Sequence, residues 1–127
     1  MKKRAPRRLR VLVADDDRDL VLTLMALLRD KGHEARGVHY GADVVDTVAY
    51  FSPDVLLLDV GLPRTTGYEI ARSLRDRYGS ARPLIVAIVD RDRPADRQLT
   101  QLAGFDHHLV KPFEPKELLR TLETLSS

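Results

Sequence analysis

The sequence predicts an α/β domain in which a five-stranded parallel sheet carries helices on both faces. Short apolar segments alternate along the chain with longer segments whose apolar residues recur at helical spacing. The strongest short segment, LIVAIV at 84–89, is apolar at every position, as strands buried on both faces are. A chain of 127 residues has the size of one domain, so the five strand–helix units are expected to share one sheet.

The first half of the chain supplies two of these units. The expected elements are a strand over 9–14, a helix over 20–28, a weaker strand over 34–38 and a helix over 42–51. Asp17 is a suitable N-cap for the first helix, and Gly32 suits its end. The second helix stops before Pro53, because a proline disfavours helical geometry in the residue that precedes it.

The second half supplies three more units. These comprise a strand over 55–58 that ends in Asp59, a helix over 68–78, a strand over 84–89, a helix over 94–103, a strand over 107–110 and a helix over 115–125. Gly61, Pro63 and Gly67 mark the loop before the helix at 68–78. Right-handed crossovers leave few topologies for such a sheet. In any of them the strands are parallel, so the loops that follow them share one edge, where open α/β sheets place their ligands.

Composition excludes several classes of protein. The chain has no cysteine, which rules out disulfide frameworks, thiol catalysis and cysteine-ligated metal centres. No apolar run approaches the length of a membrane span, and the basic N-terminus lacks the apolar core of a secretory signal. We therefore expect a cytoplasmic protein without a membrane partner.

The charge is unevenly spread. The first ten residues hold six basic residues, whereas the rest of the chain holds 15 basic and 19 acidic residues. We interpret residues 1–8 as a solvated, disordered basic tail and residues 9–125 as the folded domain. Such a tail is able to touch nucleic acid or anionic lipid, but the body has no basic stripe with interleaved aromatic residues. Nucleic-acid binding is therefore not favoured.

Charged residues follow three of the predicted strands. Asp15, Asp16 and Asp17 follow the first, Asp59 ends the third, and Lys111 follows the fifth. A dinucleotide-binding fold would need a glycine-rich turn after the first strand, and this sequence has none there. Carboxylates that converge from neighbouring strands repel one another unless a cation joins them. Oxygen ligands of this kind favour Mg²⁺ or Mn²⁺ over zinc.

The combination of these residues indicates phosphoryl chemistry. A central carboxylate between a metal ion and a lysine ammonium can receive a phosphoryl group, because the two cations neutralise the phosphoryl oxygens. Taken singly, each aspartate is better interpreted as a helix cap or loop carboxylate, and Lys111 as a solvated charge. Their joint placement after three strands favours one site.

Four segments resemble the receiver domain of two-component response regulators. They are VLVADDD at 11–17, PDVLLLDVGLPRTTGYE at 53–69, PLIVAIV at 83–89 and AGFDHHLVKPF at 103–113. The resemblance implies a flavodoxin-like, doubly wound sheet of order 2-1-3-4-5, with two helices on one face and three on the other. It also implies a cis peptide bond between Lys111 and Pro112.

The resemblance implies a role for each residue at the strand ends. Asp59 is expected to accept the phosphoryl group, and Lys111 to pair first with Asp59 and then with that group. Asp16, Asp59 and the backbone carbonyl of Gly61 are expected to bind Mg²⁺ directly. Asp15 is expected to bind the ion mainly through water.

The sequence departs from the family pattern at two positions. The family has serine or threonine at the end of the fourth strand, where counting back from Lys111 places Val89 and counting forward from Pro83 places Ile88. Neither residue has a hydroxyl, and losing one charge-assisted hydrogen bond weakens the signalling state by roughly 1.5–3 kcal/mol. His108 occupies the aromatic switch position. It either swings between buried and exposed states or is a fixed, half-buried histidine, and we favour the latter slightly.

The remaining histidines are less informative. His107 and His108 are adjacent on a predicted strand, so we expect their side chains to point to opposite faces and not to chelate one ion. We interpret His33 and His39, which flank the weak strand, as surface residues.

The leading hypothesis is a stand-alone receiver that takes a phosphoryl group from a histidine kinase or a phosphotransfer protein. No output domain follows within the chain, so we expect output through protein contacts on the face built by 94–103, 107–110 and 115–125. Such a protein phosphorylates and dephosphorylates itself in cis and is not an enzyme that turns over a separate substrate.

Two alternatives stay open. The missing hydroxyl and His108 also fit a pseudo-receiver that acts as an interaction module regardless of phosphorylation. A Mg²⁺-dependent phosphatase with an aspartate nucleophile would match the spacing of Asp15 and Asp17, but the chain has no spare sequence for a cap over the substrate.

Overall fold

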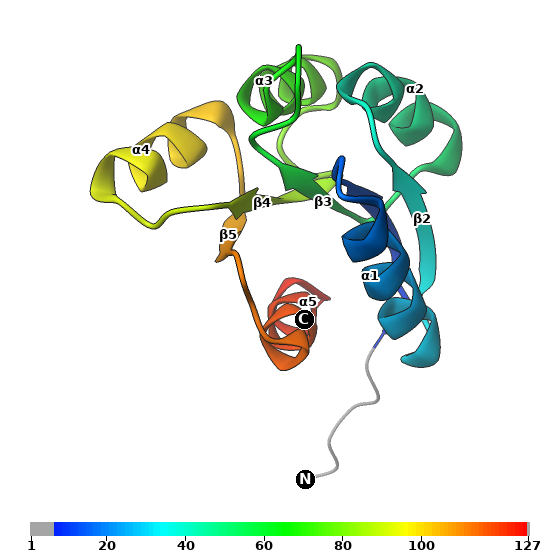
Figure 1. The fold of residues 1–127 in the computed structure, drawn as a ribbon. Coiled ribbons are helices and arrows are strands. Elements are labelled where there is room, and N and C mark those ends of the chain that lie inside the picture. The colour runs from blue at the N-terminus through cyan, green and yellow to red at the C-terminus, as the bar shows by residue number, and fades with distance from the viewer. Residues whose placement is uncertain (1–6, 127) are drawn as a thin grey trace, which may run out of the picture.

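A computed structural model describes residues 7–126, and Figure 1 shows their fold. Five strands and five helices alternate along this part of the chain. In order they are β1 (Arg10–Ala14), α1 (Arg18–Asp30), β2 (Glu34–Val38), α2 (Gly41–Phe51), β3 (Val55–Asp59), α3 (Gly67–Tyr78), β4 (Leu84–Val89), α4 (Pro94–Ala103), β5 (His107–Val110) and α5 (Pro115–Ser126). Every element that the sequence predicts is present, with ends that differ by at most two residues.

The strands form one parallel sheet of order β2-β1-β3-β4-β5, as the resemblance implied. Val11 on β1 lies beside Val55 on β3, and Asp59 at the end of β3 lies beside Ile88 on β4. All five strands run the same way, so their carboxyl ends meet at one edge. This edge carries the residues of the candidate site.

Two apolar clusters, one on each face of the sheet, form the core. α2, α3 and α4 cover one face, and α1 and α5 cover the other (Figure 1). On β3, Leu56 and Leu58 enter the first cluster and Leu57 enters the second, and all three are fully buried. Burying each such leucine contributes roughly 1.5–3 kcal/mol, which explains why the strands are apolar at consecutive positions.

The ends of α1 follow the predicted capping residues. The side chain of Asp17 accepts the backbone N–H of Leu20 at 3.1 Å and so satisfies a free donor of the first turn. At the other end, Gly32 has a φ of +88°, in the left-handed region where a side chain would be strained. The helix begins at Arg18, two residues before the expected start, because capping and not apolar spacing sets its first residue.

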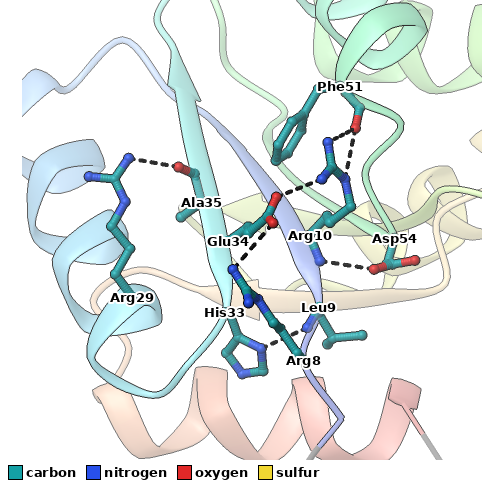
Figure 2. A network of polar contacts seen from close by, with 9 residues as sticks. All are labelled: Arg8, Leu9, Arg10, Arg29, His33, Glu34, Ala35, Phe51 and Asp54. Atoms are coloured by element: carbon teal, nitrogen blue, oxygen red, sulfur yellow. Dashed lines mark hydrogen bonds and ion pairs between the residues drawn. The ribbon is translucent and has the colours of Figure 1, made fainter.

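His33 was wrongly predicted to lie on the surface. Its residue is only 9% exposed, and its Nδ1 accepts the backbone N–H of Leu9 at 3.0 Å (Figure 2). Leu9 lies just before β1, so this bond ties the start of the sheet to the turn before β2. Burial lowers the pKa of the His33 imidazole.

Residues 1–6 of the predicted basic tail lie outside the described residues. Arg8, which was assigned to the same tail, instead places its guanidinium 3.2 Å from a carboxylate oxygen of Glu34. Among the helices of residues 7–126, none combines the length and apolar character that crossing a lipid bilayer requires.

Arg75 on α3 connects the amino ends of β4 and β5. Its Nε donates to the carbonyl of Gly104 at 2.8 Å, and its Nη1 donates to the carbonyls of Pro83 at 2.7 Å and Gly79 at 3.3 Å. Its Nη2 lies 2.6 Å from the carboxylate of Asp106. With its side chain only 13% exposed, this arginine holds the turns before both strands against α3.

Candidate functional site

The carboxyl ends of β1, β3 and β5 bring four charged side chains together. β1 and β3 are neighbours, so Asp15 and Asp16, which follow β1, lie beside Asp59 at the end of β3. One oxygen atom from each of the three carboxylates lies within 4.8 Å of the others. Lys111, which follows β5, lies with its Nζ 2.9 Å from Asp15 Oδ2 and 3.9 Å from Asp59 Oδ2. The charged pocket expected from the sequence is therefore formed.

Asp15 and Lys111 form an ion pair between a buried carboxylate and a half-buried ammonium group. Asp15 is fully buried, and its Oδ1 accepts the backbone N–H of Asp17 at 2.9 Å. Burial on its own lowers the pKa of Lys111, but the hydrogen bond to Asp15 and the charges of Asp59, Asp15 and Asp90 outweigh it and raise that pKa overall. The ammonium group is therefore held in its charged form.

Asp59 is a nearly buried carboxylate with other negative charges close to it. Its residue is 7% exposed, and its Oδ1 accepts the backbone N–H of Gly61 at 2.9 Å. Burial raises the pKa of the Asp59 carboxyl, and the charges of Asp15 and Asp16 raise it further. The bond from Gly61 and the charge of Lys111 act in the opposite direction without cancelling the rise. A cation beside Asp59 would relieve this repulsion.

The loop after β3 is fixed by a close approach of backbone at Gly67. The N–H of Gly67 donates to the carbonyl of Val60 at 3.1 Å. A Cβ at position 67 would lie 2.6 Å from Val60 Cα and 2.9 Å from the carbonyl oxygen of Asp59, so only glycine fits there. This contact holds α3 against the end of β3 and confines the loop that contains Gly61. The role of the Gly61 carbonyl as a metal ligand stays a prediction.

The donor set suits a hard divalent cation. Within residues 7–126, Asp15, Asp16 and Asp59 are the group of acidic or histidine side chains placed to hold a metal ion. All their donor atoms are oxygens, which Mg²⁺ and Mn²⁺ prefer, whereas zinc sites favour nitrogen and sulfur. Asp16 is exposed while the other two are buried, so one side of the cluster is open to water. Mg²⁺ keeps several water ligands and needs such an opening.

Val89 ends β4 on the side of the pocket near Lys111. Its carbonyl accepts the backbone N–H of Lys111 at 2.8 Å, and its side chain packs in the cluster under α2, α3 and α4. Ile88 instead packs in the cluster under α1 and α5. Neither side chain offers a hydroxyl. The assignment of Val89 to the switch position stays a prediction.

His108 belongs to a group of polar contacts that the sequence did not predict. Its Nε2 lies 3.4 Å from Asp92 Oδ1, and Arg97 donates from Nε and Nη2 to both carboxylate oxygens of Asp92. These bonds join β5, the loop after β4 and α4. The His107 and His108 rings stack with centroids 5.9 Å apart, so they lie closer together than side chains pointing to opposite faces would. Within the described residues, no metal-binding group includes them.

His39, which was interpreted from the sequence as a surface residue, makes a backbone contact that was not predicted. It is half-buried, and its Nδ1 lies 3.1 Å from the backbone carbonyl of Asp15. The contact holds the segment that carries Asp15 and Asp16 from the side of β2. No local pattern in the sequence marks this contact, because it joins residues that are 24 positions apart.

An apolar pocket of about 430 Å³ lies beside Lys111, between α1 and the segment after β5. Leu20, Leu24 and Phe113 line it, together with Pro112. The peptide bond between Lys111 and Pro112 is cis, as the resemblance implied. The sequence predicted the helix at 20–28 but not an opening beside it.

The fold and the acidic edge define a CheY-like protein of the flavodoxin fold. The solved structure of the chemotaxis response regulator CheY4 of Vibrio cholerae is similar with a TM-score of 0.87 and 27% identity, over 94% of this chain and 99% of that one. A response regulator receiver domain from Bermanella marisrubri is similar with a TM-score of 0.83 and 29% identity, over 93% of this chain and 98% of that one.

The family model of the response regulator receiver domain matches residues 11–123, and the chain belongs to this family. The response regulator MprA of Mycobacterium avium (strain 104) is 38% identical over 117 residues, which are 92% of this chain and 50% of that protein. MprA of Mycobacterium tuberculosis (strain H37Rv) is 38% identical over 116 residues. The chain spans about half the length of these relatives.

Proposed function

We propose that this chain is a receiver that accepts a phosphoryl group on Asp59 in a reaction that needs Mg²⁺. One observation supports the proposal most directly. Asp59 lies beside two further carboxylates and near an ammonium group, with Lys111 Nζ 3.9 Å from its Oδ2. A carboxylate in this position has one cation nearby and oxygen ligands for a second cation beside it.

The proposed donor is a phosphohistidine on a histidine kinase or a phosphotransfer protein. A carboxylate oxygen of Asp59 attacks phosphorus, the phosphorus–nitrogen bond breaks, and the imidazole nitrogen keeps the electron pair and takes up a proton. The product is an acyl phosphate on Asp59. Lys111 is near enough to move its contact from the Asp59 carboxylate to the new phosphoryl oxygens.

Asp16, Asp59 and the backbone carbonyl of Gly61 are the proposed direct ligands of Mg²⁺, and Asp15 is proposed to bind it through water. When bound, the ion neutralises charge on the phosphoryl oxygens. Asp15 is fully buried and already paired with Lys111, which favours the indirect role. Mn²⁺ has the same ligand preference and is expected to substitute.

Loss of the phosphoryl group is proposed to occur in the same chain, by water attack on the acyl phosphate. The protein is therefore a signalling domain and not an enzyme with a separate substrate. Val89 supplies no hydroxyl to the phosphoryl group, and the missing bond weakens the phosphorylated state by roughly 1.5–3 kcal/mol.

Two surfaces fit the partners of such a domain. Lys111 lines the apolar pocket and places its Nζ 3.9 Å from Asp59 Oδ2, so a phosphoryl donor that reaches Asp59 is expected to contact this pocket. On α4, one of the elements of the proposed output face, Leu99 and Leu102 are 51% and 78% exposed, which suits an output partner. We place the protein in the cytoplasm, where kinases charged by ATP supply phosphoryl groups.

The test is phosphorylation with acetyl phosphate and Mg²⁺, followed by intact-mass measurement and peptide mapping. We expect one phosphoryl group on Asp59 and none in Asp59→Ala. The matched control is Asp46→Asn, which removes one exposed acid on α2 and should leave the adduct unchanged. No adduct on the wild type, or an adduct that persists in Asp59→Ala, would overturn the proposal.

The second candidate is an interaction module that works without phosphorylation. The contacts of His108 and Arg97 with Asp92 favour it, because they hold the loop after β4 in place without any phosphoryl group. Amide spectra with and without beryllofluoride, a phosphoryl mimic, separate the two candidates. Large shifts that spread from Asp59 to α4, β5 and α5 would exclude the second one.

A further inference from the structure

A groove of about 660 Å³ runs along β2, at the edge of the sheet far from β5. Arg29 on α1 and Tyr50 and Phe51 on α2 form its sides, and residues of β2 form its floor. Figure 2 shows the polar contacts along this edge. None of its residues takes part in the pocket around Asp59, so a function here goes beyond the proposed one.

The groove holds more positive than negative charge. Four arginines line it, and Glu34 is the one acidic residue among its lining side chains. Glu34 takes ion pairs from Arg8 at 3.2 Å and Arg10 at 2.6 Å. Within residues 7–126, no carboxylate lies at ion-pair distance from Arg29 or Arg36. These two guanidinium groups therefore have no carboxylate partner among the described residues and are able to take one from outside.

Arg36 is held in place without a carboxylate. Its guanidinium carbon lies 5.1 Å from the ring centroid of Phe51 and 5.7 Å from that of Tyr50. Tyr50 is 67% exposed. An arginine that rests on aromatic rings is pre-organised, so it loses less conformational freedom when it binds an anion.

The backbone of β2 offers hydrogen-bonding groups on the same side. The backbone N–H of Glu34 donates to the carbonyl of Leu9 at 2.9 Å, and the carbonyl of Val38 accepts the backbone N–H of Asp15 at 3.1 Å. The backbone polar groups of alternate residues of β2 therefore point toward β1. Ala35 and Gly37 therefore face outward, where no strand of the described chain pairs. The carbonyl of Ala35 accepts from Arg29 at 2.9 Å, which leaves the polar groups of Gly37 for an added strand.

We propose that this groove binds an acidic, extended peptide segment of a partner protein. The segment pairs its backbone with the outer edge of β2 near Gly37 and its carboxylates with Arg29 and Arg36. β2 has five residues, so a segment of about the same length covers it. A second copy of this chain does not fit, because pairing two β2 edges would bring the same arginines against one another.

The test measures binding of a fluorescein-labelled peptide that alternates glutamate and valine, by fluorescence anisotropy at low and high salt. We expect saturable binding that weakens with salt. Arg36→Glu and Arg29→Glu should each weaken it about tenfold, since each reversal replaces an attraction by a repulsion. Arg77→Glu, at an exposed site on α3, makes the same charge change away from the groove and should leave binding unchanged.

A second peptide tests the backbone pairing. A proline at its centre removes a backbone donor but keeps every carboxylate, and we expect it to bind at least about fivefold more weakly. In amide spectra, the alternating peptide should shift the Ala35 and Gly37 signals first. Arg36→Gln, which removes the positive charge but keeps a polar side chain with hydrogen-bond donors, serves if Arg36→Glu does not fold, and it should also weaken binding.

Several outcomes would overturn the proposal. The first two are that the wild type does not bind the alternating peptide at low salt, or that Arg77→Glu weakens peptide binding as much as Arg36→Glu does. The other two are that the proline peptide binds as tightly as the alternating peptide, or that the first amide signals to shift lie on an element other than β2. Duplex DNA or phosphatidylserine vesicles that displace the peptide and bind more tightly than it does would assign the groove to a different partner. The assay gives the same answer in Asp59→Ala, so failure here is distinguishable from failure of the phosphorylation test.

Discussion

Replacing Val89 with threonine tests how the missing hydroxyl limits the phosphorylated state. Valine and threonine have nearly the same shape, and position 89 is 5% exposed at the end of β4, beside Lys111. A hydroxyl there is expected to add one charge-assisted hydrogen bond to a phosphoryl oxygen, worth roughly 1.5–3 kcal/mol. The affinity for beryllofluoride in the presence of Mg²⁺ should therefore rise about 10- to 150-fold.

The same substitution is expected to lower the stability of the unmodified protein. The new hydroxyl is nearly buried, and a buried hydroxyl without a partner costs about 1–3 kcal/mol. The variant should therefore unfold at lower urea concentration without beryllofluoride and recover stability with it. A change in packing alone is not expected to lower the stability of the unmodified protein while raising its affinity for beryllofluoride.

Ile88→Thr is the matched control, and it also tests the alternative alignment. Ile88 packs toward α1 and α5, on the face away from Val89, so a hydroxyl there gains no contact with a phosphoryl group. Amide spectra during a beryllofluoride titration measure both affinities. A folded Val89→Thr with unchanged affinity, or a gain seen only in Ile88→Thr, would refute the reasoning.

Three further predictions concern single groups. Lys111→Met leaves the buried carboxylate of Asp15 without its cation and should lower the free energy of unfolding by about 2 kcal/mol in urea titrations at neutral pH, discounted for partial exposure of the lysine. An unchanged urea midpoint would contradict that pairing. Arg75→Ala removes an ion pair and three bonds to carbonyls and should cost about 2–3 kcal/mol, whereas Arg77→Ala at an exposed site should be neutral. Equal effects of the two variants would refute this assignment. Burial lowers the pKa of His33 in the folded state, so the unfolded chain binds a proton that the folded chain does not, and stability should fall as the pH drops below about 6.5. Urea titrations at several pH values between neutral and mildly acidic give the free energy of unfolding as a function of pH. This free energy should fall less steeply with falling pH in His33→Gln than in the wild type, and equal pH dependence would count against a buried neutral imidazole.

The fold was predictable because the sequence within or next to each helix and strand indicates that element. LIVAIV at 84–89 has no polar face, which is compatible only with burial on both sides. Asp17 and Gly32 carry the capping chemistry that the ends of α1 require. The charged pocket was predictable for a related reason. Parallel strands deliver whatever follows them to one edge, so Asp59 and Lys111 had to approach one another.

The contacts that were missed join residues far apart in the sequence. His33 and Leu9 are separated by 24 positions, and nothing near either residue shows that the imidazole accepts a backbone N–H. Asp92 and His108 meet only because the loop after β4 folds toward β5. A lone histidine in a polar segment is compatible with an imidazole exposed to solvent and with one that is buried and hydrogen-bonded. Only the residues that pack around it decide between these two states.

The bonds of Arg75 determine which parts of the molecule are able to move. They fasten α3 to the turns before β4 and β5, at the end of the sheet opposite Asp59. The far ends of these two strands carry Val89 and Lys111, and beyond β4 lies an exposed loop. The two strands are therefore fixed to α3 at their amino ends, and their carboxyl ends connect to α4 through the contacts of Asp92 with His108 and Arg97. A change of charge at Asp59 is expected to move these carboxyl ends and α4 while the amino ends stay in place.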